Sequence, residues 1–187
     1  MRQKILKTAA ERFSRYGYHK TTLEDIASDL NKVKSAIYYY FDNKEDILKA
    51  VIDTAIFKLS ASIKDAVEKA VTPKEQLYAF ITSHIQSLCK ITQNYTSILE
   101  LYFLEHGIVN EARSIYNDKT VKHIESILEN GNKTNDFEVK NIKNAAMVVN
   151  IALKGAAQEY ASVKSGNVKA MSEAMAEIFI KAFQRKK

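Results

Sequence analysis

Glycine and proline are scarce in this chain, and that scarcity constrains its fold more than any other feature. The sequence has one proline, Pro73, and five glycines among 187 residues. Proteins built from short strands rely on these two residues for the turns between strands, so a chain with so few of them cannot form many such turns. Apolar residues recur instead at helical spacing. The sequence therefore predicts an all-α fold.

The composition excludes several classes of protein. Hydrophobic residues make up 46% of the chain and charged residues 27%, which is too apolar for a disordered chain and too charged for a membrane protein. No stretch approaches about 18 uncharged apolar residues and no long apolar run follows the N-terminus, so we expect neither a membrane span nor a secretory signal. A single cysteine, Cys89, excludes an intrachain disulfide framework. We therefore expect an intracellular, cytoplasmic protein.

The positive charge is concentrated near the N-terminus. The net charge is +6; residues 1–41 carry eight Lys/Arg and four Asp/Glu, whereas residues 42–187 carry 20 and 18. An excess of Lys and Arg on one segment is typical of proteins that bind a polyanion. The pattern favours a polyanion-binding head on a nearly neutral body.

The head begins with an amphipathic helix. Ile5, Ala9 and Phe13 recur every four residues over residues 2–16. Gly17 is expected to end this helix because glycine adopts the left-handed conformation easily.

Two short helices follow. A threonine hydroxyl of the pair Thr21-Thr22 can cap the first of them, and Asn31 can supply a left-handed residue in the tight turn that ends it. The second covers about residues 34–40. Two short helices with a break of about three residues between them have the spacing of a helix-turn-helix, whose second helix lies in the major groove of DNA.

The second of these short helices carries three consecutive tyrosines, Tyr38–Tyr40. Tyrosyl hydroxyls can donate to phosphates while the rings pack on sugar or on a thymine methyl. The polar residues that fall away from the apolar line of Val33 and Ile37 are Lys34, Ser35, Tyr38 and Tyr39. The alternative is that the tyrosines only brace the three-helix head.

A run of spaced motifs covers about residues 3–50 without a gap. It comprises Ala9-Ala10, Phe13, Gly17-Tyr18, Thr21-Thr22, Ile26-Ala27, Ile37-Tyr38-Tyr39-Tyr40-Phe41 and Asn43-Lys44-Glu45-Asp46-Ile47-Leu48. This run resembles the DNA-binding head of the TetR family of bacterial repressors. The resemblance implies a homodimeric, ligand-responsive transcription regulator, usually a repressor. It implies a helix-turn-helix DNA-binding domain over residues 1–48 and, over residues 49–187, an α-helical domain for effector binding and dimerisation, reached through a long helix.

The resemblance also assigns roles by position. Thr22 and Tyr40 would contact phosphates, and Lys44 would clamp the flanking strand at the start of the fourth helix. Bases and backbone would be touched by Lys34, Ser35, Tyr38 and Tyr39. The implied partner is double-stranded DNA with a palindromic operator. The positions expected to pack inside the head and not to touch DNA are Ile26, Ala27, Ile37 and Phe41.

The turn departs from the family pattern. Gly-Val-Ser is common there, and this chain has Asn31-Lys32-Val33. Asn31 can replace the glycine conformationally, and Val33 is expected to pack inward and leave Lys32 for the DNA backbone. The departure gives some support to an alternative function, a helical small-molecule-binding or scaffold protein that no longer reads DNA.

Beyond the head the periodicity predicts only helices. Gly107 and the segment 131–136 are expected to break them, and Pro73 is expected in a first helical turn. The predicted ranges are 44–70, 74–91, 95–106, 110–130, 139–164 and 168–185.

The last two helices are the candidate dimer interface. In the family the corresponding helices form a four-helix bundle with those of a second subunit, and an isologous interface needs one self-complementary apolar face. The candidate residues are Met147, Val148, Ile151, Gly155, Met175, Ile178, Phe179 and Ala182. Burial in the chain's own core is the alternative.

The middle helices carry the candidate effector site. Its residues lie on three helices that would converge in the family arrangement, and an apolar lining with a few polar groups is typical of ligand pockets. These residues favour a hydrophobic or aromatic effector, with ordinary core packing as the alternative. They are Phe80, His84, Leu88, Tyr102, Phe103, His106 and Tyr116.

Enzymatic readings find little support in the sequence. There is no Gly-rich phosphate loop, no His-Glu-x-x-His and no nucleophile elbow. Cys89 and His84 are five residues apart, which points them away from each other on a helix, so Cys89 is expected to be a buried, inert thiol. The four histidines have no metal-ligand spacing. We expect no catalytic residue, no metal and no cofactor, and an all-α enzyme is the least favoured alternative.

Overall fold

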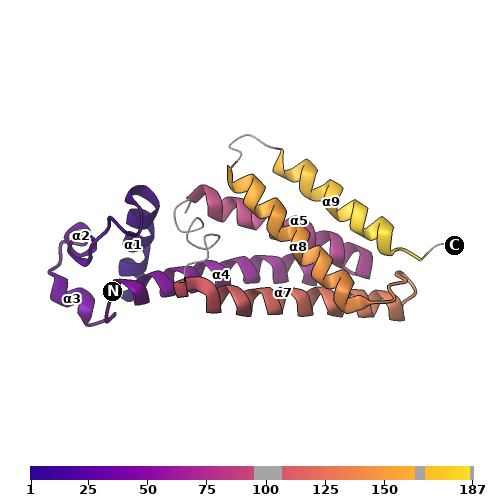
Figure 1. The fold of residues 1–187 in the computed structure, drawn as a ribbon, viewed down its shortest axis with the longest axis horizontal. Coiled ribbons are helices and arrows are strands. Elements are labelled where there is room, and N and C mark those ends of the chain that lie inside the picture. The colour runs from indigo at the N-terminus through magenta and orange to yellow at the C-terminus, as the bar shows by residue number, and fades with distance from the viewer. Residues whose placement is uncertain (95–106, 163–166, 186–187) are drawn as a thin grey trace. The chain divides into compact units, whose positions relative to one another are not determined.

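A computed structural model describes residues 1–94, 107–162 and 167–185 (Figure 1). These residues form helices, which confirms the predicted all-α class. In the described part of the chain, no helix combines the length and the apolarity that crossing a bilayer requires. The helices are α1 (Arg2–Tyr16), α2 (Leu23–Asp29), α3 (Lys34–Tyr38), α4 (Lys44–Glu68), α5 (Pro73–Asn94), α7 (Gly107–Lys133), α8 (Ile142–Ser162) and α9 (Val168–Phe183).

The chain divides into two compact units. The first contains Met1–Phe57 and Ile91–Ser114, and the second contains Lys58–Lys90 and Ile115–Lys187. The boundary expected between residues 48 and 49 stays a prediction. The helix expected over residues 95–106 lies outside the described residues.

The core of the first unit is built from the predicted apolar stripes. Ile5, Ala9 and Phe13 of α1 are fully buried, as the four-residue spacing predicted. Because each large side chain of this kind contributes roughly 1.5–3 kcal/mol on burial, the contact of α1 with its neighbours holds the head together. The other buried members of this cluster are Leu6, Ala10, Leu23, Ile26, Ala27, Ile37, Phe41, Ile47, Leu48, Val51 and Ile52.

Two residues with positive φ end the first two helices. Gly17 has φ 84° and follows α1, and its N–H donates to the Phe13 carbonyl. Asn31 has φ 52° and follows α2. The N–H of Asn31 donates to the Ser28 carbonyl and the N–H of Lys32 to the Ala27 carbonyl, which is the Schellman pattern of helix termination. Both predicted stops are confirmed, and Asn31 supplies the conformation for which the family commonly uses glycine.

The second unit packs around large apolar side chains. Leu77, Phe80 and Ile81 of α5 are buried, as are Ile124 and Leu128 of α7. Helix α8 adds the buried side chains of Ala146, Val149 and Leu153. Pro73 is the first residue of α5, as predicted, because a residue at that position needs no intrahelical N–H bond.

The break predicted over residues 131–136 is present but starts three residues later than expected. Helix α7 runs through Gly131 to Lys133, and the turn begins only after that, with Asn135 at φ 61°. Gly131 serves packing instead, because a Cβ placed there would lie 2.0 Å from Cδ2 of the buried Phe137 ring. The glycine therefore marks a close approach of an aromatic ring and not a helix end.

Candidate nucleic-acid interface

The N-terminus of α2 is fixed by a reciprocal capping box. The Asp25 N–H donates to the Thr22 hydroxyl oxygen at 3.1 Å, and the Thr22 N–H donates to the Asp25 carboxylate at 2.8 Å. The Thr22 hydroxyl also donates to that carboxylate at 2.7 Å. Of the two threonines that the sequence offered as a cap, Thr22 is the N-cap. These hydrogen bonds from Thr22 lower the pKa of the Asp25 carboxyl, so the cap is charged at neutral pH.

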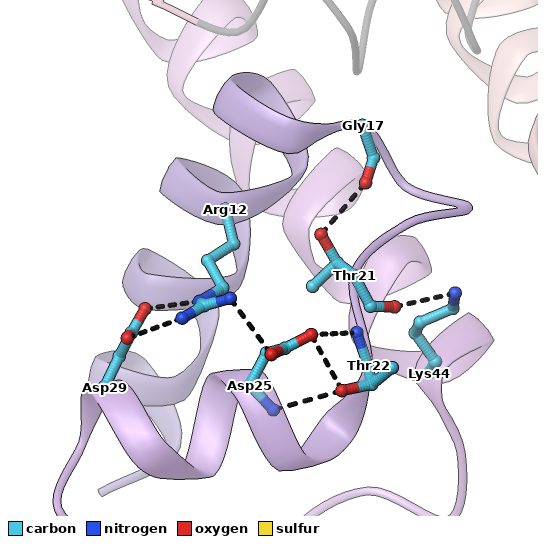
Figure 2. Close-up of polar contacts among 7 residues, drawn as sticks. All are labelled: Arg12, Gly17, Thr21, Thr22, Asp25, Asp29 and Lys44. Carbon is cyan, nitrogen blue, oxygen red and sulfur yellow. Dashed lines mark hydrogen bonds and ion pairs between the residues drawn. The ribbon is translucent and has the colours of Figure 1, made fainter.

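Arg12 of α1 links this cap to the other end of α2 (Figure 2). Its guanidinium makes a two-pronged contact with the Asp29 carboxylate, with an Nη2–Oδ1 distance of 2.7 Å, and lies 3.3 Å from Asp25. The hydrogen bond from Arg12 lowers the pKa of Asp29. Sequence reasoning missed Arg12 and Asp29, because a contact across 17 residues leaves no local pattern.

The three consecutive tyrosines, Tyr38–Tyr40, are on the surface. Helix α3 ends at Tyr38, two residues before the predicted end, and only Ile37 of its five residues is buried. Tyr39 is 82% exposed, and Tyr38 and Tyr40 are also exposed. The Tyr39 and Tyr40 rings meet edge to face at 4.9 Å. Ser35 is exposed as well, so this segment presents hydroxyls and flat rings to solvent.

The expectation that Val33 packs inward is wrong. Val33 is 71% exposed. It is the N-cap of α3 with an extended backbone (φ −86°, ψ 155°), so its side chain does not continue the helical line that ends in Ile37. It makes no side-chain capping bond, which agrees with the loss of the hydroxyl that serine would supply. Lys32 beside it is exposed.

Lys34 is engaged by a carboxylate. Its Nζ lies 2.6 Å from Oε1 of Glu24 in the first turn of α2 and 5.5 Å from the centroid of the Tyr38 ring. The hydrogen bond between the two side chains raises the pKa of Lys34 and lowers that of Glu24, so both are charged at neutral pH. This ion pair joins α2 to α3.

Lys44 holds the loop between α1 and α2. Its Nζ donates to the carbonyl oxygens of Tyr18 and Thr21, both at 2.9 Å, and to that of His19 at 3.5 Å. The ammonium also lies 4.4 Å from the centroid of the Tyr18 ring. Figure 2 shows the Lys44 side chain directed at the segment that leads into the Thr22 cap. Burial lowers the pKa of Lys44. All three ammonium hydrogens have acceptors in this arrangement.

The described part of the candidate effector site lies in the second unit. Phe80, His84 and Tyr116 are buried, and Leu88 is half-buried. The His84 ring lies 5.8 Å from each of the other two rings, centroid to centroid, so the structure brings these three together. Tyr102, Phe103 and His106 lie outside the described residues.

The unusual group in this cluster is the His84 imidazole. Its Nε2 lies 3.4 Å from the Tyr116 hydroxyl, and its buried Nδ1 has no hydrogen-bond partner among the described residues. Burial lowers the pKa of His84 to about 4, so the ring is neutral at pH 7. Sequence reasoning missed His123, whose ring packs edge to face on Phe80 at 4.9 Å. Nothing in the spacing along the chain marked that contact.

The candidate dimer face is apolar and largely exposed on the single chain. Met147, Val148 and Ile151 of α8 are exposed, as is Ile178 of α9. Nothing lies within 4 Å of a Cβ placed on Gly155. Ala182 is exposed, whereas Met175 and Phe179 are half-buried. Phe179 stacks on Phe183 at 5.8 Å, so it also belongs to the chain's own packing.

The described regions contain the single cysteine and side chains of the types that can bind a metal ion. Cys89 is buried, and burial raises the pKa of its thiol, which keeps it protonated and unreactive at neutral pH. Among the described residues, no three His, Cys, Asp or Glu side chains are grouped to hold a metal ion.

Comparison with known proteins agrees with the head's geometry. Residues 5–51 match the family described as "Bacterial regulatory proteins, tetR family". The chain is 26% identical over 137 residues to the probable acrEF/envCD operon repressor of Escherichia coli K12, covering 66% of this chain and 60% of that repressor. It is 34% identical over 85 residues to the biofilm operon icaADBC negative transcriptional regulator IcaR of Staphylococcus aureus strain Newman, covering 46% of each. The chain thus spans less than two thirds of the length of these relatives.

The fold also resembles that of solved structures. A crystal structure of a TetR/AcrR-family transcriptional regulator from Thermobifida fusca matches with a TM-score of 0.78, 21% identity and 98% coverage of both chains. At that identity the likeness concerns the fold alone, and the family match, over residues 5–51, concerns the head. Residues 5–51 are therefore the part of the chain that matches the tetR family of bacterial regulatory proteins, and the chain shares its fold with a solved structure from that family.

Proposed function

We propose that this chain is a DNA-binding transcriptional repressor that reads DNA with α3. The observation that carries the proposal is the exposed tyrosine segment Tyr38–Tyr40 after a rigidly capped α2, within residues 1–41, which carry eight Lys/Arg against four Asp/Glu. A buried core helix would hide such rings. Exposed hydroxyls and rings on the second helix of a helix-turn-helix suit phosphate and thymine contacts.

The proposed contacts divide by chemistry. Ser35, Tyr38 and Tyr39 would touch bases and backbone, and Tyr40 and the N-terminus of α2 at Thr22 would meet phosphates. Lys34 would join them after leaving Glu24. Because the Lys44 ammonium is already surrounded by carbonyl oxygens, we assign Lys44 to holding the α1–α2 loop in position for these contacts.

We also propose that the chain acts as a homodimer on a palindromic operator. Two recognition helices that dock together need half-sites about one helical turn apart, roughly 34–36 Å. The exposed apolar side chains of α8 and α9 support a self-complementary interface. Ile151→Glu should then shift the chain from dimer to monomer in sedimentation equilibrium. Ile115→Glu, an exposed isoleucine on α7, is the matched control and should leave the mass unchanged.

The proposed switch is a small, largely apolar effector that binds near His84. A neutral imidazole with an unpaired buried nitrogen supports a ligand with one uncharged polar group beside an apolar body. Native mass spectrometry of protein purified from its source cells tests this claim directly. A retained small molecule that is lost in His84→Leu would support it, and a well-packed body with no bound molecule would count against it.

Binding to DNA is tested by a gel shift on duplexes from the region upstream of its own gene. Tyr38→Ala and Tyr39→Ala should each weaken binding by about ten- to a hundredfold, since a good contact to a base contributes about 1–3 kcal/mol. Tyr16→Ala is the matched control, because Tyr16 is 48% exposed and Tyr38 47%, and Tyr16 lies at the end of α1. If no duplex binds at low salt, the alternative of a helical scaffold or small-molecule-binding protein that does not read DNA is the correct one.

A further inference from the structure

Glu24 places a negative charge among residues that would face DNA. It lies in the first turn of α2, and its carboxylate binds the first residue of α3, Lys34, at 2.6 Å. The two side chains are exposed, Glu24 at 60% and Lys34 at 42%. Neither is needed to fill the core of the head, which is built from apolar side chains.

The Glu24–Lys34 ion pair adds little to folding stability, but Glu24 competes with DNA phosphates for the Lys34 ammonium. Exposed ion pairs contribute little to folding stability, because water and salt screen them. The same exposure lets a phosphate compete for the Lys34 ammonium. Exchanging the carboxylate for a phosphate replaces one ion pair by another and leaves the Glu24 charge beside the polyanion. The exchange therefore yields little net affinity where phosphates are the only partner.

Other acids of the head are differently placed. Asp25 and Asp29 are occupied by Arg12 and by the Thr22 cap, and replacing them would disturb the helix ends. Glu11 pairs with Lys7 at 3.9 Å within α1. Among the described carboxylates of residues 1–41, Glu24 is the one paired with a lysine of α3.

We propose that Glu24 is a specificity-determining residue that withholds Lys34 from non-specific DNA. Random duplex offers mainly phosphate contacts, so Lys34 stays with Glu24 there and adds little to binding. At the operator, α3 lies in the major groove and its other side chains contact bases. These contacts accompany the transfer of Lys34 from Glu24 to a DNA phosphate. This inference rests on the proposed DNA-binding function.

A double-mutant cycle on random-sequence DNA tests the inference without knowledge of the operator. The full-length chain and its variants Glu24→Gln, Lys34→Gln and the double variant are titrated into a fluorescein-labelled random duplex over a salt series. Glu24→Gln should bind about fivefold tighter than wild type at low salt, and the slope of log K against log salt should steepen by about 0.9 per head. Lys34→Gln should be nearly neutral in the wild-type background and weaken binding about fivefold in the Glu24→Gln background.

Glu11→Gln is the matched control. It removes the same charge from a side chain that is 64% exposed and also paired with a lysine, but on α1. A gain equal to that of Glu24→Gln would overturn the inference, because it would mean that only net charge matters. A gain from Glu24→Gln that persists unchanged in the Lys34→Gln background would overturn it as well. If the wild-type chain binds no duplex at low salt, the proposed function fails and the inference falls with it.

Discussion

The helix-turn-helix head and the second unit are stabilised in different ways. In the head, α2 and α3 are seven and five residues long and bury few side chains, and ion pairs and caps fix their ends. In the second unit, long helices meet through buried aromatic and aliphatic side chains. There the His84 Nδ1 is buried without a partner among the described residues.

The difference follows from helix length. A short helix has too little apolar surface to be oriented by burial alone, so polar contacts with defined directions must orient it. A helix of twenty residues can bury a full stripe and tolerate an unsatisfied polar atom. The head is therefore expected to respond to loss of polar contacts, and the second unit to loss of volume and to protonation.

The largest effect is expected from removing volume in the second unit. Phe80→Ala deletes a ring that is 2% exposed and should lower the free energy of unfolding by about 3–5 kcal/mol, measured by urea denaturation. Phe57→Ala is the control, since Phe57 is 74% exposed and its loss should change stability by less than about 0.5 kcal/mol. Equal losses in the two variants would contradict burial as the main source of stability.

Protonation of His84 is expected to destabilise the second unit in mild acid. The pKa of His84 lies at about 4 in the fold, below its usual value of 6.5, because burial disfavours the charged ring. The unfolded chain therefore binds more protons between these pH values, and stability falls as pH falls through this window. The loss between pH 7 and pH 5 should be about 2 kcal/mol.

Denaturation curves of His84→Gln at the two pH values check this expectation. The variant should lose less stability than wild type on acidification. His19→Gln removes an exposed histidine of the head and should behave as wild type does. A pH dependence that is the same in wild type and in His84→Gln would show that His84 does not titrate in this window.

The head could be predicted from sequence because its signals are local. Gly17, the Thr22 cap and Asn31 act within a few residues of where they stand, so their patterns show in the sequence. Contacts between segments left no such signal. The Arg12–Asp29 pair and the carbonyl oxygens around Lys44 join residues 17 and 23–26 positions apart, and only the fold brings them together.

The second unit was predictable in class and less so in detail. Helical periodicity predicted its helices. The helix end was predicted at Gly131, because the sequence does not distinguish a glycine that ends a helix from one that leaves room for an aromatic ring. The prediction that Val33 packs inward was wrong for a related reason. Helical periodicity does not apply to a residue whose backbone is extended. The His84–Tyr116 approach depends on how α5 and α7 pack, which periodicity does not specify.

An intermediate effect is expected from Lys44 in the head. Lys44→Met removes ammonium bonds to carbonyl oxygens and should lower the free energy of unfolding by about 1–2 kcal/mol, because hydrogen bonds to a charged group are among the stronger ones. Lys49→Met, five residues further along α4, removes an exposed pair with Glu45 and should lose about 0.5 kcal/mol or less. Thermal and urea unfolding measure both. A Lys44→Met variant that loses DNA affinity and salt dependence but no stability would show that Lys44 acts as a phosphate contact.

The smallest effect is expected from the Thr22 cap. Thr22→Ala leaves the Asp25 N–H without its acceptor and should lower the free energy of unfolding by about 1 kcal/mol. Thr54→Ala is the matched control, because the Thr54 hydroxyl donates back to the Ala50 carbonyl within α4 and caps nothing. Alanine is the better helix former there, so that change should be neutral or slightly stabilising. Should both variants unfold at the same urea concentration as wild type, the capping box would not be what fixes α2, and the Arg12 contacts would have to orient it alone.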